Sequence, residues 1–128
     1  MTCYWSGILN ALNRNDFERI CKKSPKCEEL IRFLQQHNTK EHQITWNGKL
    51  LTAQEKEENY IAVRDYNIGG IRRGHLCSSC DYFLFLIAEV FQTNIDHYYL
   101  GRLMKYKNIA AKRTMTFKSN KGHFWFLK

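Results

Sequence analysis

The segment from Asn67 to Val90 constrains the fold most, because a basic, glycine-rich loop and a Cys-x-x-Cys step lead there into the most apolar run of the chain. That run extends from Tyr82 to Phe91, and it is shorter than the ~18 residues that a membrane-spanning helix needs. We therefore predict a buried core helix from about residue 80 to Gln92, against which the other segments pack. The glycines before it allow the backbone to approach a bound group closely.

The size of the chain suits one folded domain. Its 128 residues are 44% hydrophobic and 25% charged, which is typical of a protein with one hydrophobic core. We predict a helical part over residues 1–66, followed over 67–128 by the Cys-x-x-Cys loop, the core helix, a second helix and a basic hairpin. The formal net charge of +8 favours polyanionic partners. Residues 100–128 contain eight basic residues and no acidic one.

The pattern of apolar residues and capping signals predicts a mainly α-helical fold that ends in a β-hairpin. The predicted hairpin joins Arg113–Phe117 to His123–Leu127, and a short extended piece at Gln43–Trp46 precedes an Asn-Gly turn. The predicted helices cover residues 4–12, 16–23, 24–37, 52–66, 80–92 and 96–107.

The last two predicted helices and the hairpin together resemble a winged helix-turn-helix. In such a module the second helix enters a groove of the nucleic acid and the hairpin forms the wing. The expected nucleic-acid contacts are Arg72, Arg73, Tyr98, Arg102, Lys105, Lys118 and Lys121. The same elements also suit a module that docks onto a host protein through aromatic side chains, namely Tyr98, Phe124, Trp125 and Phe126.

Cys77 and Cys80 have the spacing of a zinc knuckle, which supplies two of the four ligands of a structural zinc ion. Cys3 and His75 are the weaker candidates for the remaining ligands. His123 and the Cys21/Cys27 pair are further ones. Packed thiols and a redox function remain as alternatives to zinc.

Cys3 and His123 suggest a second possibility, nucleophilic catalysis by a cysteine. A cysteine that opens an apolar helix and a histidine on a strand are typical of papain-like cysteine proteases. Two residues precede Cys3, so no upstream side chain supplies an oxyanion hole, and no clear Asn or Asp follows His123 to orient it. The sequence therefore favours a nonenzymatic protein over a protease.

The start of the chain does not have the pattern of a signal peptide, and the number of cysteines, five, is odd. These features predict a reducing compartment, the nucleus or otherwise the cytoplasm, with no membrane as partner. Whether the chain forms a homodimer is left open.

Three separated motifs resemble the folded part of the small nonstructural nuclear phosphoprotein of bocaparvoviruses and related parvoviral accessory proteins. They are Cys3-Tyr4-Trp5, Ile44-x-Trp46, and the Cys-x-x-Cys step followed by Asp81-Tyr82. The resemblance covers roughly residues 3–90, and the basic C-terminal segment departs from the acidic tail of that family. It implies a nonenzymatic regulator of viral replication and transcript processing that acts in the host nucleus with host nuclear proteins.

Overall fold

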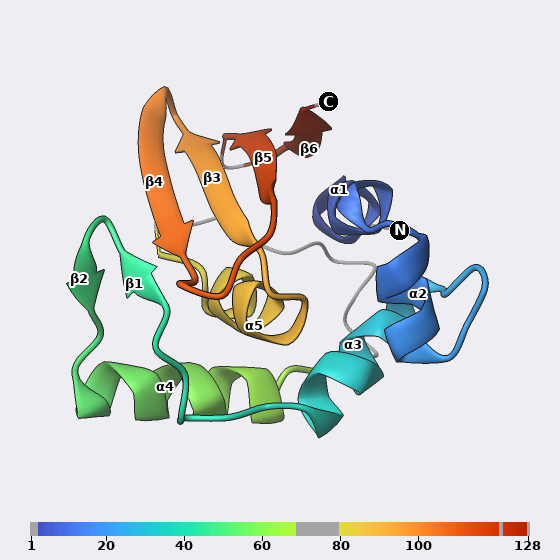
Figure 1. Cartoon of the computed structure of the whole chain (residues 1–128), viewed down its shortest axis with the longest axis horizontal. Helices are drawn as coiled ribbons and strands as arrows, with labels where there is room; N and C mark the ends of the chain where they lie inside the picture. Colours follow the sequence, from blue (N-terminus) through green and yellow to red (C-terminus); the bar gives the residue numbers. More distant parts are fainter. Residues whose placement is uncertain (1–2, 69–79, 121, 128) are drawn as a thin grey trace.

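The computed structural model describes residues 3–68, 80–120 and 122–127 (Figure 1). Within these ranges the chain forms five helices and one mixed sheet of six strands, so the prediction of a mainly α-helical fold is wrong. The helices are α1 Cys3–Ala11, α2 Arg14–Ile20, α3 Cys27–Gln36, α4 Ala53–Arg64 and α5 Tyr82–Val90. The strands are β1 Thr45–Trp46, β2 Lys49–Leu50, β3 Asn94–Tyr99, β4 Arg102–Lys107, β5 Thr114–Ser119 and β6 Phe124–Leu127.

The sheet draws on both halves of the chain. Its strand order is β2-β1-β4-β3-β5-β6, in which β3 and β5 are parallel and the other neighbours are antiparallel. The short β1–β2 hairpin contains the end of the extended piece predicted at Gln43–Trp46 and the Asn47-Gly48 turn, and it joins the sheet through β4. In Figure 1, α3, α4 and α5 lie below the long strands, and α1 lies beside β6.

The helix predicted over 96–107 is instead the hairpin β3–β4, and this removes the winged helix-turn-helix. Burial alternates along β3, where Ile95 and His97 are buried, and this is the period of a strand. Leu100 and Gly101 connect the strands with φ of 51° and 80°, as in a tight type I′ turn. The strand period and the turn together outweigh the Asp96 capping signal.

Other local signals are reproduced more closely. Thr52 caps α4 in a capping box with Glu55, and the predicted C-terminal hairpin is present as β5–β6. In α2, however, Asn13 is the cap and Asp16 is its capping-box partner. Helix α3 begins at Cys27, two residues after Pro25.

Helix α5 is the centre of the core, as the apolar run predicts. Six of its nine residues are buried: Phe83, Leu84, Phe85, Leu86, Ile87 and Ala88. The Trp5 ring lies 4.8 Å from Phe83 in an edge-on arrangement, so α1 packs directly on α5. At the other end of α5, the Arg19 guanidinium of α2 donates to the carbonyl of Val90.

Candidate functional site

Helix α1 lies unusually close to strand β6 because residue 7 is glycine. A Cβ atom at Gly7 would lie 2.8 Å from Cδ1 of Phe124, which is closer than two carbon atoms approach without a shift. The Tyr4 and Phe124 rings are 4.7 Å apart, so the contact includes the first turn of α1 and the first residue of β6. Figure 1 shows the same two elements side by side.

This contact brings two sequence-predicted residues to the same place in the fold. Cys3 is the first residue of α1, directly before Tyr4, and His123 directly precedes Phe124. The side chain of Cys3 lies outside the described part of the structure. Since consecutive Cα atoms are ~3.8 Å apart, the backbones of Cys3 and His123 are each one residue from the Tyr4–Phe124 contact.

A turn before β6 fixes the position of His123. The side-chain oxygen of Asn120 accepts the backbone N–H of His123 at 2.8 Å and that of Gly122 at 2.9 Å. The N–H of Asn120 donates to the carbonyl of His123 at 2.9 Å. His123 itself is exposed, so its ring is accessible from solvent. These hydrogen bonds hold the backbone of His123 and do not involve its ring.

A buried carboxylate, Asp81, holds the start of α1 against the start of α5. Its Oδ1 atom accepts the Tyr4 hydroxyl at 3.0 Å and the backbone N–H groups of Phe83 and Leu84 at 2.9 and 3.2 Å. The N–H of Asp81 donates to the Tyr106 hydroxyl of β4 at 2.9 Å. One residue therefore connects two helix starts, through its carboxylate, with the sheet, through its backbone N–H. In the sequence, Asp81 is notable only as the residue that follows the Cys-x-x-Cys step, at the predicted start of the core helix.

A buried histidine–serine pair, His97 of β3 and Ser119 of β5, lies next to Phe124. The Nε2 atom of His97 is 2.6 Å from the Ser119 hydroxyl, and its buried Nδ1 atom has no hydrogen-bond partner among the described residues. Burial lowers the pKa of His97 to about 4, and the charge of Asp81 opposes this shift in part. Both residues are buried, and substrate cannot reach a serine in that position. We therefore assign this pair to the core.

The predicted zinc ligands are only partly within the described residues. Cys77 and His75 lie outside them, and among the residues that are described no three metal-binding side chains converge. Cys80 is exposed, but partial desolvation of its thiol, together with the charges of Glu55 and Asp81, raises its pKa to about 11. Cys21 is exposed and Cys27 is buried with a pKa raised by burial. Zinc at Cys77 and Cys80 therefore stays a prediction.

The predicted nucleic-acid contacts that the structure describes lie on two opposite faces of the sheet. Tyr98, Lys105 and Lys118 lie on the face of the sheet that points away from the core. Arg102 lies on the opposite face of β4 from Lys105, the face that carries the buried Met104. Arg72, Arg73 and Lys121 lie outside the described residues.

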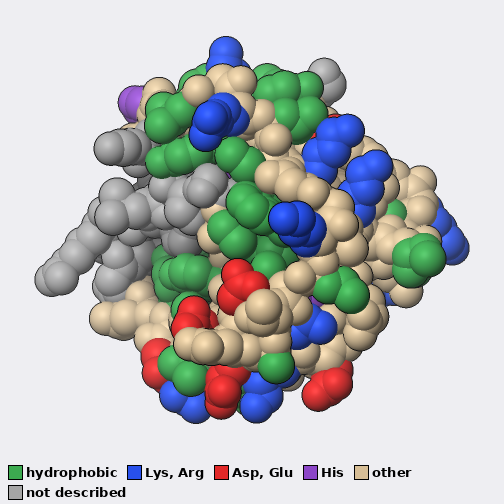
Figure 2. All heavy atoms as spheres, turned by 90° about the vertical axis from the view of Figure 1, so that its left-hand side faces the viewer, with side chains coloured by type: hydrophobic (Ala, Val, Ile, Leu, Met, Phe, Trp, Pro, Cys, Tyr) green, Lys and Arg blue, Asp and Glu red, His purple; other side chains and the backbone are tan. Residues whose placement is uncertain are grey.

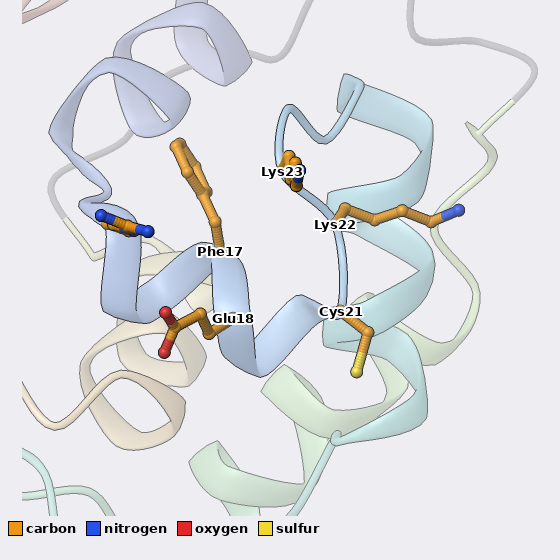
Figure 3. A pocket seen from close by; sticks show the side chains of 6 residues that line it. Phe17, Glu18, Cys21, Lys22 and Lys23 are labelled. Atoms are coloured by element: carbon orange, nitrogen blue, oxygen red, sulfur yellow. The ribbon is translucent and has the colours of Figure 1, made fainter.

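A separate pocket of about 650 Å³ lies at α2 and the α2–α3 connection (Figure 3). Its lining consists of Arg14, Phe17, Glu18, Cys21, Lys22 and Lys23. In Figure 3 the Phe17 ring and the Cys21 sulfur point in opposite directions, and none of the lining side chains drawn there is a base beside the sulfur. This arrangement offers no nucleophile and base in contact, so we place no chemistry there.

Comparisons with protein-family models, with curated proteins and with solved structures each give no match for this chain. The resemblance to parvoviral accessory proteins, with its nuclear location and host partners, therefore stays a prediction. None of the helices in the described part of the chain is both long and apolar enough to cross a bilayer.

Proposed function

We propose that the protein is a cysteine-dependent hydrolase of amide bonds, in which Cys3 is the nucleophile and His123 the general base. The packing of the first turn of α1 on the first residue of β6 is the observation that supports this proposal. Cys3 and His123, which are 120 residues apart in sequence, each directly precede one residue of the Tyr4–Phe124 contact. Of the alternatives that the sequence leaves open, the arrangement of α1 and β6 favours this one.

The position of Cys3 suits a reactive thiol. The N-terminus of a helix stabilises a thiolate and lowers its pKa, and α1 has no acidic residue in its first turn to oppose this effect. The backbone N–H groups of a helix start also stabilise an oxyanion, so no upstream side chain is needed for that role. This answers the objection that the sequence raised against a protease.

The reaction proceeds in two steps. His123 takes the thiol proton, the sulfur attacks the carbonyl carbon, and the proton passes to the leaving amine as the C–N bond breaks. A water molecule then gives its proton to His123 and attacks the thioester. The acid product leaves and the thiol is restored. Asp81 holds Tyr4, the neighbour of Cys3, through its hydroxyl, and Asn120 holds the backbone of His123; neither is assigned a contact with the substrate.

A thiol-labelling experiment tests the proposal. The native protein is treated with iodoacetamide at about pH 6 and about pH 8.5, and the alkylated cysteines are located by peptide mass spectrometry. Cys3 should react at the lower pH. Cys21 is exposed and Cys80 has a pKa of about 11, so these two cysteines are references within the same molecule.

The variant His123→Ala should slow the alkylation of Cys3 at about pH 6 by roughly 10-fold or more and leave Cys21 unchanged. Cys3→Ala should abolish the hydrolysis of a fluorogenic peptide or isopeptide substrate. If Cys3 reacts no faster than Cys21 at either pH and is insensitive to His123→Ala, the dyad does not exist. The nonenzymatic role predicted from the sequence would then be preferred.

A further inference from the structure

The outer face of the sheet carries an aromatic and basic row that crosses four strands. The strand register places Leu103, Tyr98, Lys118 and Trp125 beside one another on β4, β3, β5 and β6. The Tyr98 and Trp125 side chains are 38% and 40% exposed, which is high for large aromatic residues. The Lys118 ammonium lies 5.9 Å from the centre of the Trp125 ring.

The next row continues the same surface. It consists of Lys105, Asp96, Thr116 and Leu127, and an open hollow of about 580 Å³ lies between the two rows. Its lining is Tyr98, Gly101, Thr116, Lys118 and Leu127. Neighbouring strands are ~4.8 Å apart, so the backbones at Tyr98 and Trp125, two strands apart, are about 10 Å apart. A lysine therefore stands between two separated aromatic rings.

The charge of this surface selects the partner. On the outer face of β3–β6 the basic residues are Lys105, Lys107 and Lys118, and the one acidic residue, Asp96, is paired across the strands with Lys105. In Figure 2 most of the visible acidic side chains lie in the lower half, around α4, while basic side chains dominate the part above it. An anionic ligand is therefore attracted to the strands and repelled by α4.

We propose that the outer face of β3–β6 binds single-stranded nucleic acid. Bases stack on Tyr98 and Trp125, and Lys118 and Lys105 contact the phosphates between them. Stacking on exposed sheet aromatics requires unpaired bases, because the faces of bases in a duplex are covered. This inference does not rest on the proposed hydrolase, since it uses none of the residues at α1 or His123.

The test measures binding by fluorescence anisotropy. The protein is titrated into labelled oligo(U) and oligo(dT) of about 12 nucleotides, and into a duplex of the same length, from ~50 to ~200 mM salt. Both single strands should bind and the duplex should bind more weakly. Tighter binding of the RNA strand would add a contact to the 2′-hydroxyl, and equal binding would mean stacking and phosphate contacts alone.

Three variants separate stacking from general attraction. Tyr98→Leu keeps an apolar side chain but removes the ring, and should weaken binding roughly 5-fold to 100-fold, whereas Tyr98→Phe should bind as the native protein does. Lys118→Ala should reduce the salt dependence, with a slope of log K against log salt that is smaller by about 0.7. Lys23→Ala, at an exposed lysine outside the sheet, is the matched control.

Three results would overturn the inference. They are the absence of saturable binding to both single strands at ~50 mM salt, equal binding by Tyr98→Leu and the native protein, and equal losses for Lys118→Ala and Lys23→Ala. The first two would favour a protein partner on this face. The third would mean that net charge alone attracts the strand.

Discussion

Asp81 shows how much of the candidate site depends on one side chain. It is buried, it caps α5, and it accepts the hydroxyl of Tyr4 in α1. Sequence reasoning identified the chemical groups, Cys3 and His123, because residue type and local pattern are enough to suggest them. It missed the supporting role of Asp81, because the Tyr4–Asp81 hydrogen bond joins residues 77 positions apart.

Replacing Asp81 by alanine should destabilise the protein by roughly 2–4 kcal/mol, because α5 loses its cap and the buried Tyr4 hydroxyl loses an acceptor. Asp81→Asn keeps an oxygen acceptor and should lose less. The measurement is the free energy of unfolding in urea. Asp65→Ala, at an exposed carboxylate beside Arg64, is the control and should not change it measurably. Equal stability of the two alanine variants would contradict this role for Asp81.

His97 should make the protein less stable in mild acid. Its pKa is about 4 in the folded state and ~6.5 when unfolded, so the unfolded chain binds the extra proton between these values. Stability is therefore complete above about pH 6.5 and falls as the pH decreases towards 4, by about 3 kcal/mol in all. His42, whose pKa is also lowered by burial, acts in the same direction.

Urea unfolding at about pH 7 and about pH 4.5 tests this prediction. His97→Gln keeps a polar group near Ser119 but does not titrate, so the loss of stability between the two pH values should be about 2 kcal/mol smaller than in the native protein. An unchanged difference would mean that other groups cause the acid sensitivity.

At the scale of elements, the sequence predicted helices α1, α4 and α5 and the β5–β6 hairpin with nearly correct ends. These elements have strong local signals, such as the Thr52 capping box and the apolar run of α5. The β3–β4 hairpin was missed because its turn, Leu100-Gly101, is not one of the common turn pairs and Asp96 mimics a helix cap. The alternating burial along β3 and β4 is what distinguishes the observed hairpin from the predicted helix over 96–107.

The turn of that hairpin offers a stabilising substitution. Leu100 is exposed and has a φ of 51°, which costs an ordinary side chain ~1–2 kcal/mol. Leu100→Asn should raise the free energy of unfolding by roughly 0.5–1 kcal/mol, because asparagine adopts this conformation more easily. Gly101→Ala should lower it by about 1 kcal/mol, although a methyl group there meets no other atom. Urea midpoints measure both, and a helical 96–107 would reverse the two signs.

The close contact between α1 and β6 gives a double-mutant test. Gly7→Ala inside a helix normally adds ~0.5–1 kcal/mol of stability, but here the new methyl group meets the Phe124 ring, at a cost of about 1–3 kcal/mol. We expect the single variant to be less stable than the native protein. In a Phe124→Leu background the same substitution should become neutral or stabilising, as measured by urea unfolding of all four proteins. A stabilising Gly7→Ala on its own would place α1 further from β6.

At the scale of the whole molecule, the sheet order could not be predicted. The parallel pair β3–β5 requires the chain to leave the sheet after β4 and return beside β3, and β1 joins through β4. No local pattern encodes these pairings, because each one depends on how all the strands together bury their apolar faces. The basic residues that were expected on a helix and a wing lie instead on strands, and the two faces of the sheet divide them. Arg102 consequently separates from Lys105.

The pairing of α1 with β6 has a consequence for how the molecule is made. During synthesis at ~5–20 residues per second, α1 emerges roughly 10 s before the strand on which it rests. Until then Tyr4, which is buried against Phe124 in the complete fold, lacks this contact. A chain that stops before His123 would contain Cys3 but not the histidine that the proposed hydrolysis requires, so we expect no hydrolysis from it.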